Sequence, residues 1–173
     1  MNKVLELFAG SRSFSKVAEE LGYETFSVDI KDFDSIDYVT DILDFNVDKV
    51  PFKPDVIWAS PPCTYFSVAS IGHHWNKDHT PKTKEAINGI KIVTKTLEII
   101  DYFQPSYFFI ENPRGKLRKL DFMKYLPRTT VTYCQYGDNR MKPTDIWTNH
   151  LYNPLFSNGW KPKPICKNGD SCH

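Results

Sequence analysis

A cysteine follows two prolines where an apolar run ends. The motif Pro61-Pro62-Cys63 comes directly after the strand-like segment 55–60, and proline stops a strand because it lacks an amide donor and restricts the residue before it. The Cys63 thiol is therefore expected at the carboxyl edge of a sheet, where open α/β folds bind ligands. A second apolar run, 107–110, leads into Glu111-Asn112-Pro113. A thiol and a carboxyl group at two strand ends predict a nucleophile with an acid partner, and so an enzyme.

The first 42 residues contain three strand ends of the kind that bind a nucleoside. The turn around Gly10 is built from small residues, which lets a ligand approach the backbone and the unpaired amides of the next helix. Asp29 ends the second strand, where an acidic residue commonly binds ribose, and Asp41 ends the third, where it could meet an adenine edge. Each aspartate alone is equally well explained as a cap or turn residue, but the three strand ends together favour a nucleoside cofactor. The residues expected to bind it are Phe8, Ala9, Gly10, Ser11, Asp29, Ile30, Asp41, Ile42 and Pro61.

The elements that must hold these residues alternate between strand and helix. Apolar side chains three or four apart from Ile87 to Phe103 predict a long amphipathic helix that ends before Pro105. Further helices are expected at 14–21 and 116–126, and a long loop at 61–83. The alternation predicts an α/β fold with a doubly wound, mostly parallel sheet. Its strands are expected at residues 3–8, 25–30, 38–42, 55–60, 107–110, 129–135 and 145–149, and an irregular tail at 151–173.

These motifs and their order resemble the cytosine-C5 DNA methyltransferase family. That family has a Phe-x-Gly turn, a Pro-Pro-Cys-x-x-Phe-Ser nucleophile loop and a Glu-Asn-Val/Pro acid, and residues 3–147 follow the same order. The resemblance implies a Rossmann-like methyltransferase fold with residues 1–150 as catalytic domain, S-adenosylmethionine as cofactor and cytosine in DNA as substrate. It further implies that Cys63 attacks C6 of the base and that Glu111 holds the N3 edge. Arg140 lies where the family has a Gln-x-Arg-x-Arg pattern and is the third expected catalytic residue.

The chain also departs from the family pattern. Arg12 and Ser13 stand where the family has two glycines, and the target-recognition region and the late segment that covers the cofactor are missing. Three interpretations stay open: a fragment, a minimal phage- or bacterium-type enzyme, or half of an assembly whose accessory subunit or dimer partner supplies recognition. Two further functions also stay open. One is a non-catalytic DNA- or protein-binding accessory protein, and the other is methyl transfer to RNA or to a free pyrimidine nucleotide.

The charge of the 173-residue chain is balanced overall but uneven along its length. Its formal net charge is +1, so no global basic field indicates nucleic acid. Basic runs at 77–84 and 112–128 nevertheless follow the two strand-end motifs. Such runs are most often solvated faces, yet this position also suits phosphate contact. The residues expected to contact nucleic acid are Lys77, Lys82, Lys84, Arg114, Lys116 and Arg118.

The sequence indicates neither export nor a structural metal. The apolar runs are of strand length and the N-terminus is charged early, so we expect a cytoplasmic protein of a bacterial or phage-infected cell, with no membrane association. Disulfides are not expected among Cys63, Cys134, Cys166 and Cys172 in such a compartment. The spacing of Cys166, Cys172 and His173 is loose for zinc, and no metal site is predicted.

Overall fold

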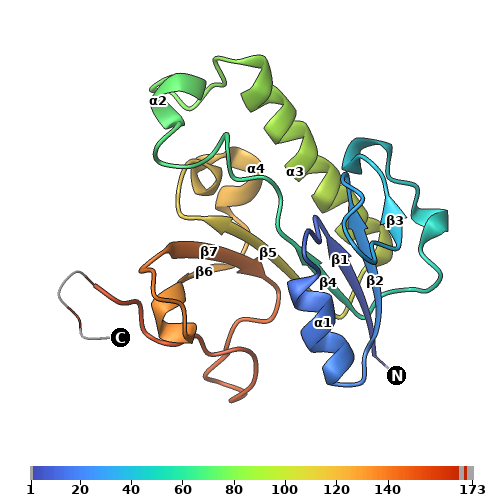
Figure 1. Ribbon diagram of the computed structural model, residues 1–173. Helices are drawn as coiled ribbons and strands as arrows, with labels where there is room; N and C mark the ends of the chain where they lie inside the picture. Colours follow the sequence, from blue (N-terminus) through green and yellow to red (C-terminus); the bar gives the residue numbers. More distant parts are fainter. Residues whose placement is uncertain (1, 168–169, 171–173) are drawn as a thin grey trace.

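A seven-stranded sheet forms the centre of the computed structural model, which describes residues 2–167 and residue 170. Its strands are β1 (Lys3–Leu7), β2 (Glu24–Asp29), β3 (Tyr38–Val39), β4 (Val56–Ala59), β5 (Tyr107–Pro113), β6 (Arg128–Thr132) and β7 (Pro143–Thr148). From edge to edge the order is β3-β2-β1-β4-β5-β7-β6 (Figure 1). Strands β1 to β5 pair in parallel, and β7 runs antiparallel to both of its neighbours. The expected α/β fold with a mostly parallel sheet is confirmed.

Two helices cover the sheet from opposite sides. Helix α1 (Ser13–Glu20) packs beside β1 and β2, and helix α3 (Lys84–Phe103) crosses the other face (Figure 1). Helix α3 begins where the Thr83 hydroxyl accepts a 3.2 Å hydrogen bond from the Ala86 amide, and it ends before Gln104, whose φ is 45°. The long helix predicted from apolar spacing is therefore confirmed. Its buried side chains join those of the strands in one core that includes Leu5, Leu7, Ile57, Ala59, Val93, Ile99, Ile110 and Trp147.

The short elements differ from the sequence prediction in several places. The third strand, expected at 38–42, ends at Val39, because Asp41 already caps the 3₁₀ turn that follows. The single helix expected at 116–126 is wrong: a 3₁₀ turn, η3 (Leu117–Lys119), and a short helix, α4 (Asp121–Lys124), replace it. Leu120 between them is extended, with ψ of 140°, which lets both turns bury an apolar side chain. The sixth strand ends at Thr132, three residues earlier than expected, and a 3₁₀ turn, η4 (Tyr133–Tyr136), follows it. The remaining short elements are η1 (Ile42–Asp44), η2 (Val47–Lys49) and α2 (Ile71–His74), the last within the expected loop.

The register of the central strands sets where the reactive motifs begin. Ala59, the last residue of β4, pairs with Ile110 of β5, which continues beside β7 as far as Pro113. Neighbouring strands lie about 4.8 Å apart. The Pro-Pro-Cys motif therefore leaves the sheet beside the Glu-Asn-Pro motif, which lies within β5 and does not follow its end as expected, because β7 continues the pairing through these residues.

The described part of the tail, residues 151–167, packs along η4 and β6 without forming a regular element. The Lys163 amide donates to the Tyr136 hydroxyl at 2.9 Å, and the Cys166 amide donates to the Thr132 hydroxyl at 3.0 Å. No helix in the described residues has the length and hydrophobicity of a membrane span. Of the loosely spaced zinc ligands considered from sequence, Cys172 and His173 lie outside the described residues.

Candidate active site

The Pro-Pro-Cys motif opens the nucleophile loop (residues 61–83), which is joined to β5 by a buried hydrogen bond. The Asn112 side-chain amide donates to the Pro61 carbonyl at 2.9 Å. The Cys63 carbonyl then accepts bonds of 3.0 Å from the amides of Phe66 and Ser67, which closes a tight turn. Cys63 itself is a partly exposed free thiol. The loop therefore presents its thiol from a turn that the neighbouring strand holds in place.

A second set of contacts fixes the far side of the nucleophile loop. The Lys116 amide donates to the Phe66 carbonyl at 2.7 Å. Gly115 approaches the same oxygen so closely that an added Cβ would lie 2.2 Å from it, which leaves no room for a side chain. The buried Lys116 ammonium group lies 2.6 Å from His79 Nδ1 and 5.2 Å above the Trp75 ring. Lys116 is thus held inside the protein, so its ammonium group is not on the surface expected to contact nucleic acid.

Glu111 is the acidic group that the sheet brings to this edge. Its mostly buried carboxyl group accepts a 2.9 Å hydrogen bond at Oε1 from the Tyr133 hydroxyl, and Lys142 Nζ lies 3.9 Å from the same oxygen. Burial raises the pKa of Glu111, while the Tyr133 bond and the Lys142 charge oppose that rise. Burial, together with the Glu111 carboxylate, raises the pKa of Tyr133 well above its ordinary value. Burial is the largest of these effects, so the raised pKa lets the Glu111 carboxyl group hold a proton to a higher pH than an exposed glutamate does.

The third expected catalytic residue, Arg140, forms an ion pair with Asp138 and not with Glu111. Its guanidinium group is 71% exposed and binds Asp138, with Nε 3.0 Å from Oδ1 and Nη2 2.7 Å from Oδ2. These bonds lower the pKa of Asp138 to about 2. The cation beside Glu111 is Lys142 instead. Sequence reasoning did not single out Tyr133, because nothing in the local pattern distinguishes it from other tyrosines.

The turn after β1 leaves open space beside Gly10. This residue has φ of 52°, and no atom would lie within 4 Å of a Cβ added to it. Asp29 holds the turn: its Oδ2 accepts from the Gly10 amide and its Oδ1 from the Lys31 amide, both at 2.9 Å. The Asp41 carboxylate similarly accepts a 2.9 Å bond from Leu43 and caps η1. Both aspartates thus make the turn and cap contacts, and each carboxylate oxygen retains a lone pair for a ligand.

The apolar residues expected around the cofactor are distributed between surface and core. Ile30, directly after β2, is 61% exposed, whereas Ile42 is buried in the core. Phe8 is partly buried and adopts φ of 61°. Ala9 is buried and donates to the Val28 carbonyl at 3.0 Å, and Ser11 is exposed. Of the expected apolar residues, Phe8 and Ile30 are therefore the ones that keep surface for a ligand.

The first helix offers fewer free amides than expected. The buried Glu6 carboxylate accepts from the amides of Phe14 at 3.3 Å and Ser15 at 2.8 Å, and also from the Ser15 hydroxyl. The prediction that unpaired amides of this helix meet the cofactor is thus wrong at these two positions. Arg12 has φ of 57°, a conformation that favours glycine, and its side chain binds the Ser27 hydroxyl at 3.2 Å and pairs with Glu19.

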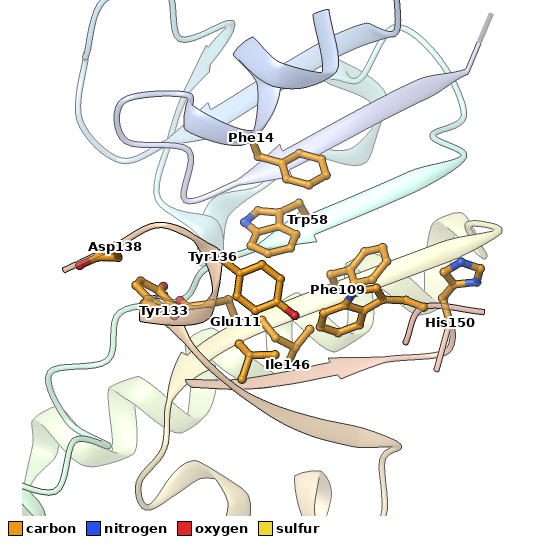
Figure 2. Close-up of a pocket in the computed structure, with 11 residues that line it drawn as sticks. Phe14, Trp58, Phe109, Glu111, Tyr133, Tyr136, Asp138, Ile146 and His150 are labelled. Carbon is orange, nitrogen blue, oxygen red and sulfur yellow. Dashed lines mark hydrogen bonds between the residues drawn. The ribbon is translucent and has the colours of Figure 1, made fainter. Parts of the chain in front are cut away.

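An aromatic cavity of about 780 Å³ extends from Glu111 along the face of β4, β5 and β7. Figure 2 shows Phe14, from α1, above Trp58, from β4. Their rings stack 4.7 Å apart at 12°, and Phe109 lies 6.0 Å from Trp58. The other lining residues are Val131, Tyr133, Tyr136, Asp138, Ile146, His150 and Trp160. Such walls suit a planar or apolar group.

The remaining basic residues of the expected set divide into Arg118, which forms an ion pair, and four that are exposed. Asp145 is fully buried and binds Arg118 Nε at 2.8 Å, Arg128 at 3.3 Å and the Thr130 hydroxyl at 2.8 Å. Arg118 is committed to this ion pair, so we also leave it out of the nucleic-acid surface. The residues of the expected set that are exposed are Lys77, Lys82, Lys84 and Arg114.

The chain is similar to known proteins in sequence and in fold. The family model described as C-5 cytosine-specific DNA methylase matches residues 2–131. A Frog virus 3 (isolate Goorha) protein named as a probable DNA (cytosine-5)-methyltransferase is 34% identical over 178 aligned residues, which cover 98% of this chain and 77% of that protein. The crystal structure of a prophage-encoded E. coli protein, assigned as a DNA modification methyltransferase, has a TM-score of 0.64 at 16% identity. That match covers 95% of this chain and 52% of the other, so the chain spans about half the length of that protein.

Proposed function

We propose that this chain, which belongs to the C-5 cytosine-specific DNA methylase family, transfers a methyl group from S-adenosylmethionine to carbon 5 of cytosine in DNA. The observation that carries the proposal is a free thiol just past the end of β4 and a mostly buried carboxyl group within the adjacent strand β5, whose neighbouring residue Asn112 binds the Pro61 carbonyl. This pairing supports nucleophilic activation of a base, because carbon 5 of cytosine is too weak a nucleophile to accept a methyl group unaided.

Cys63 and Glu111 would share the activation of the base. The Cys63 thiolate attacks C6, and the new S–C6 bond moves electron density to C5. Glu111 donates a proton to N3, which neutralises the charge that develops on the ring, and accepts a hydrogen bond from the exocyclic amine. After methylation, C5 loses its proton to solvent, the S–C6 bond breaks and releases the thiolate, and N3 returns its proton to Glu111. The raised pKa of Glu111 supports its role as the proton donor.

The edge of the sheet between β1 and β2 would hold the cofactor. The open space beside Gly10 fits a ligand that approaches the backbone, and Asp29 retains lone pairs for ribose hydroxyls. The exposed Ile30 and the partly buried Phe8 offer apolar surface for an adenine ring. When bound, S-adenosylmethionine supplies an electrophilic methyl group. Because C6 is covered in a duplex, the target base must leave the stack, and the nucleophile loop would enclose it.

Methyl transfer followed by nucleoside analysis tests the proposal. The purified chain and labelled S-adenosylmethionine are incubated with duplex DNA, single-stranded DNA, RNA and free cytidine nucleotides. Label in 5-methyldeoxycytidine is expected from DNA. We expect Cys63→Ser to abolish transfer. Cys134→Ser, which changes a buried cysteine outside the nucleophile loop, should retain it. Label only in N4-methylcytosine, in RNA or in free nucleotides would overturn the proposal. Cofactor binding without transfer to any substrate would instead favour an accessory role.

A further inference from the structure

Tyr133 contacts the catalytic carboxyl group from a different element of the fold. It is the first residue of η4, directly after β6, whereas Glu111 belongs to β5, and β7 lies between those two strands. The Tyr133 hydroxyl is 2.9 Å from Glu111 Oε1. Lys142 Nζ lies 4.6 Å above the Tyr133 ring and 3.9 Å from the same carboxyl oxygen. Two donors from outside β5 therefore converge on Oε1.

We infer that Tyr133 is a positioning residue that makes Glu111 Oε1 the accepting oxygen and leaves Oε2 to carry the proton given to the base. The inference rests on the proposed function, since it concerns the same carboxyl group and its cytosine substrate. Sequence motifs did not assign Tyr133 any role.

The hydrogen-bonding pattern of cytosine requires the two oxygens of Glu111 to differ. N3 of the base accepts a hydrogen bond and its exocyclic amine donates one, so the carboxyl group must present one O–H and one acceptor. An oxygen that already carries a proton is a poor acceptor. Because the Tyr133 hydroxyl donates to Oε1, the proton is favoured on Oε2. A carbonyl-type oxygen has two lone pairs, so Oε1 can accept from Tyr133 and from the amine together.

The surroundings of Tyr133 keep it in the donor role. Its hydroxyl proton is retained at working pH, since burial and the Glu111 charge both oppose ionisation. Lys142 alone would not select an oxygen as strictly, because an ammonium group on a flexible stem acts as a mobile point charge. The other charged groups near this end of the cavity, Asp138 and Arg140, are paired with each other.

The experiment measures the Glu111 pKa and the rate of methyl transfer in Tyr133→Phe. Carboxyl ¹³C NMR, assigned with Glu111→Gln, reports the pKa in the cofactor-free protein without any need for activity. Phe removes a donor that stabilises the ionised carboxylate, so the pKa of Glu111 should rise by about one pH unit. The kcat for cytosine should fall roughly tenfold with little change in KM, which is the scale of one lost hydrogen bond. The high-pH limb of the pH–rate profile should move to higher pH as the pKa of Glu111 rises.

Two comparisons separate this role from a structural one. In a Glu111→Gln background, adding Tyr133→Phe should cause no further loss of rate, because Tyr133 acts through Glu111. Tyr125→Phe, which changes a tyrosine that is 82% exposed, should leave both the pKa and kcat unchanged. An unaltered Glu111 pKa in Tyr133→Phe, or an equal loss of rate in the Gln background, overturns the inference. If Tyr133→Phe raises the pKa of Glu111 but the wild-type protein methylates no cytosine, the contact between the two residues stands and the proposed function is refuted.

Discussion

The Asn112 side chain donates a 2.9 Å hydrogen bond to the main-chain carbonyl of Pro61, and both groups are buried. Asn112 follows Glu111 directly in β5, and Pro61 precedes Cys63 by two residues. The bond therefore links the strand that carries the acid to the loop that carries the thiol. It explains physically why an asparagine stands between Glu111 and Pro113: an amide can reach across to a carbonyl whose own strand has ended.

Asn112→Ala should weaken both the fold and the reaction. The Pro61 carbonyl loses its buried partner, and the free energy of unfolding should fall by about 1–3 kcal/mol in urea titrations. The nucleophile loop then loses its hydrogen bond to β5. Covalent trapping of Cys63 by DNA containing 5-fluorocytosine should therefore slow by about tenfold or more.

Asn149→Ala provides the matched control for that change. Asn149 also bridges backbone groups: it accepts from the Phe108 amide and donates to the Ser106 carbonyl, each at 3.0 Å, near the opposite end of β5. This variant should lose stability without slowing the trapping reaction. Equal slowing in both variants would show that the Asn112 bond supports the fold alone.

Gly115→Ala should displace the nucleophile loop from the other side. The added Cβ would lie 2.2 Å from the Phe66 carbonyl oxygen, so the backbone must shift, at a cost of about 1–3 kcal/mol in urea unfolding. Gly72→Ala is the control, since no atom would lie within 4 Å of a Cβ added there and alanine suits a helix. Its stability should stay within about 0.5 kcal/mol of the wild type. Equal stability of the two variants would mean that the close approach of Gly115 does not constrain the loop.

Glu111→Gln should become relatively more stable as pH rises. Burial raises the pKa of Glu111 in the folded state above its ordinary value of 4.5. Between these two values the folded protein holds a proton that the unfolded chain has lost, so wild-type stability falls with rising pH. Gln does not titrate. The difference in unfolding free energy, Gln variant minus wild type, should therefore grow as pH rises from 4.5 through the raised pKa and then level off.

Asp121→Asn should show the opposite dependence of stability on pH, because the pKa of Asp121 is lowered and not raised. The bond from Lys124 lowers the pKa of the exposed Asp121 below 3.8, so the wild type keeps this stabilisation above 3.8 and loses it as pH falls through the lowered pKa. The free energy of unfolding of the wild type should therefore increase relative to that of Asp121→Asn as pH rises. If the stability difference between variant and wild type changed with pH in the same direction for Glu111→Gln and Asp121→Asn, the raised pKa of Glu111 would be contradicted.

The position of Cys63 shortly after β4 was predictable because local chemistry determines it, whereas β5 runs through Glu111 to Pro113, three residues past its expected end. Proline ends a strand whatever surrounds it, and parallel strands direct their carboxyl ends to one edge. Helix α3 was predictable for a similar reason, since its apolar side chains recur over twenty residues. The expected helix at 116–126 failed because Leu117, Leu120 and Met123 have helical spacing but are buried by two short turns around an extended residue.

The roles of Tyr133 and Arg118 could not be predicted, because each depends on a distant partner. Tyr133 is 22 residues from Glu111, and Arg118 is 27 residues from Asp145. Composition shows that a segment is basic but does not show which charges find a buried carboxylate. Only the antiparallel pairing of β7 with β5 and β6 brings these partners together.

The exposed basic residues beside the nucleophile loop should contact DNA phosphates. Lys77, Lys82, Lys84 and Arg114 are all exposed and follow the two sequence motifs that carry Cys63 and Glu111. Each lost phosphate contact on a duplex reduces the salt slope by about 0.9. Replacing all four by Gln should therefore reduce the slope of log K against log salt by about three to four, as measured by fluorescence anisotropy on a labelled duplex.

Arg118→Gln is the control that separates a phosphate contact from a structural charge. Its guanidinium group binds the fully buried Asp145, so the variant should unfold at lower urea concentration, with a loss of about 1–3 kcal/mol. Its salt slope should match that of the wild type, because the side chain is already neutralised within the protein. A slope that falls by about one in Arg118→Gln, with no change in the fourfold variant, would assign the phosphate contact to Arg118 and leave the exposed residues as a solvated face.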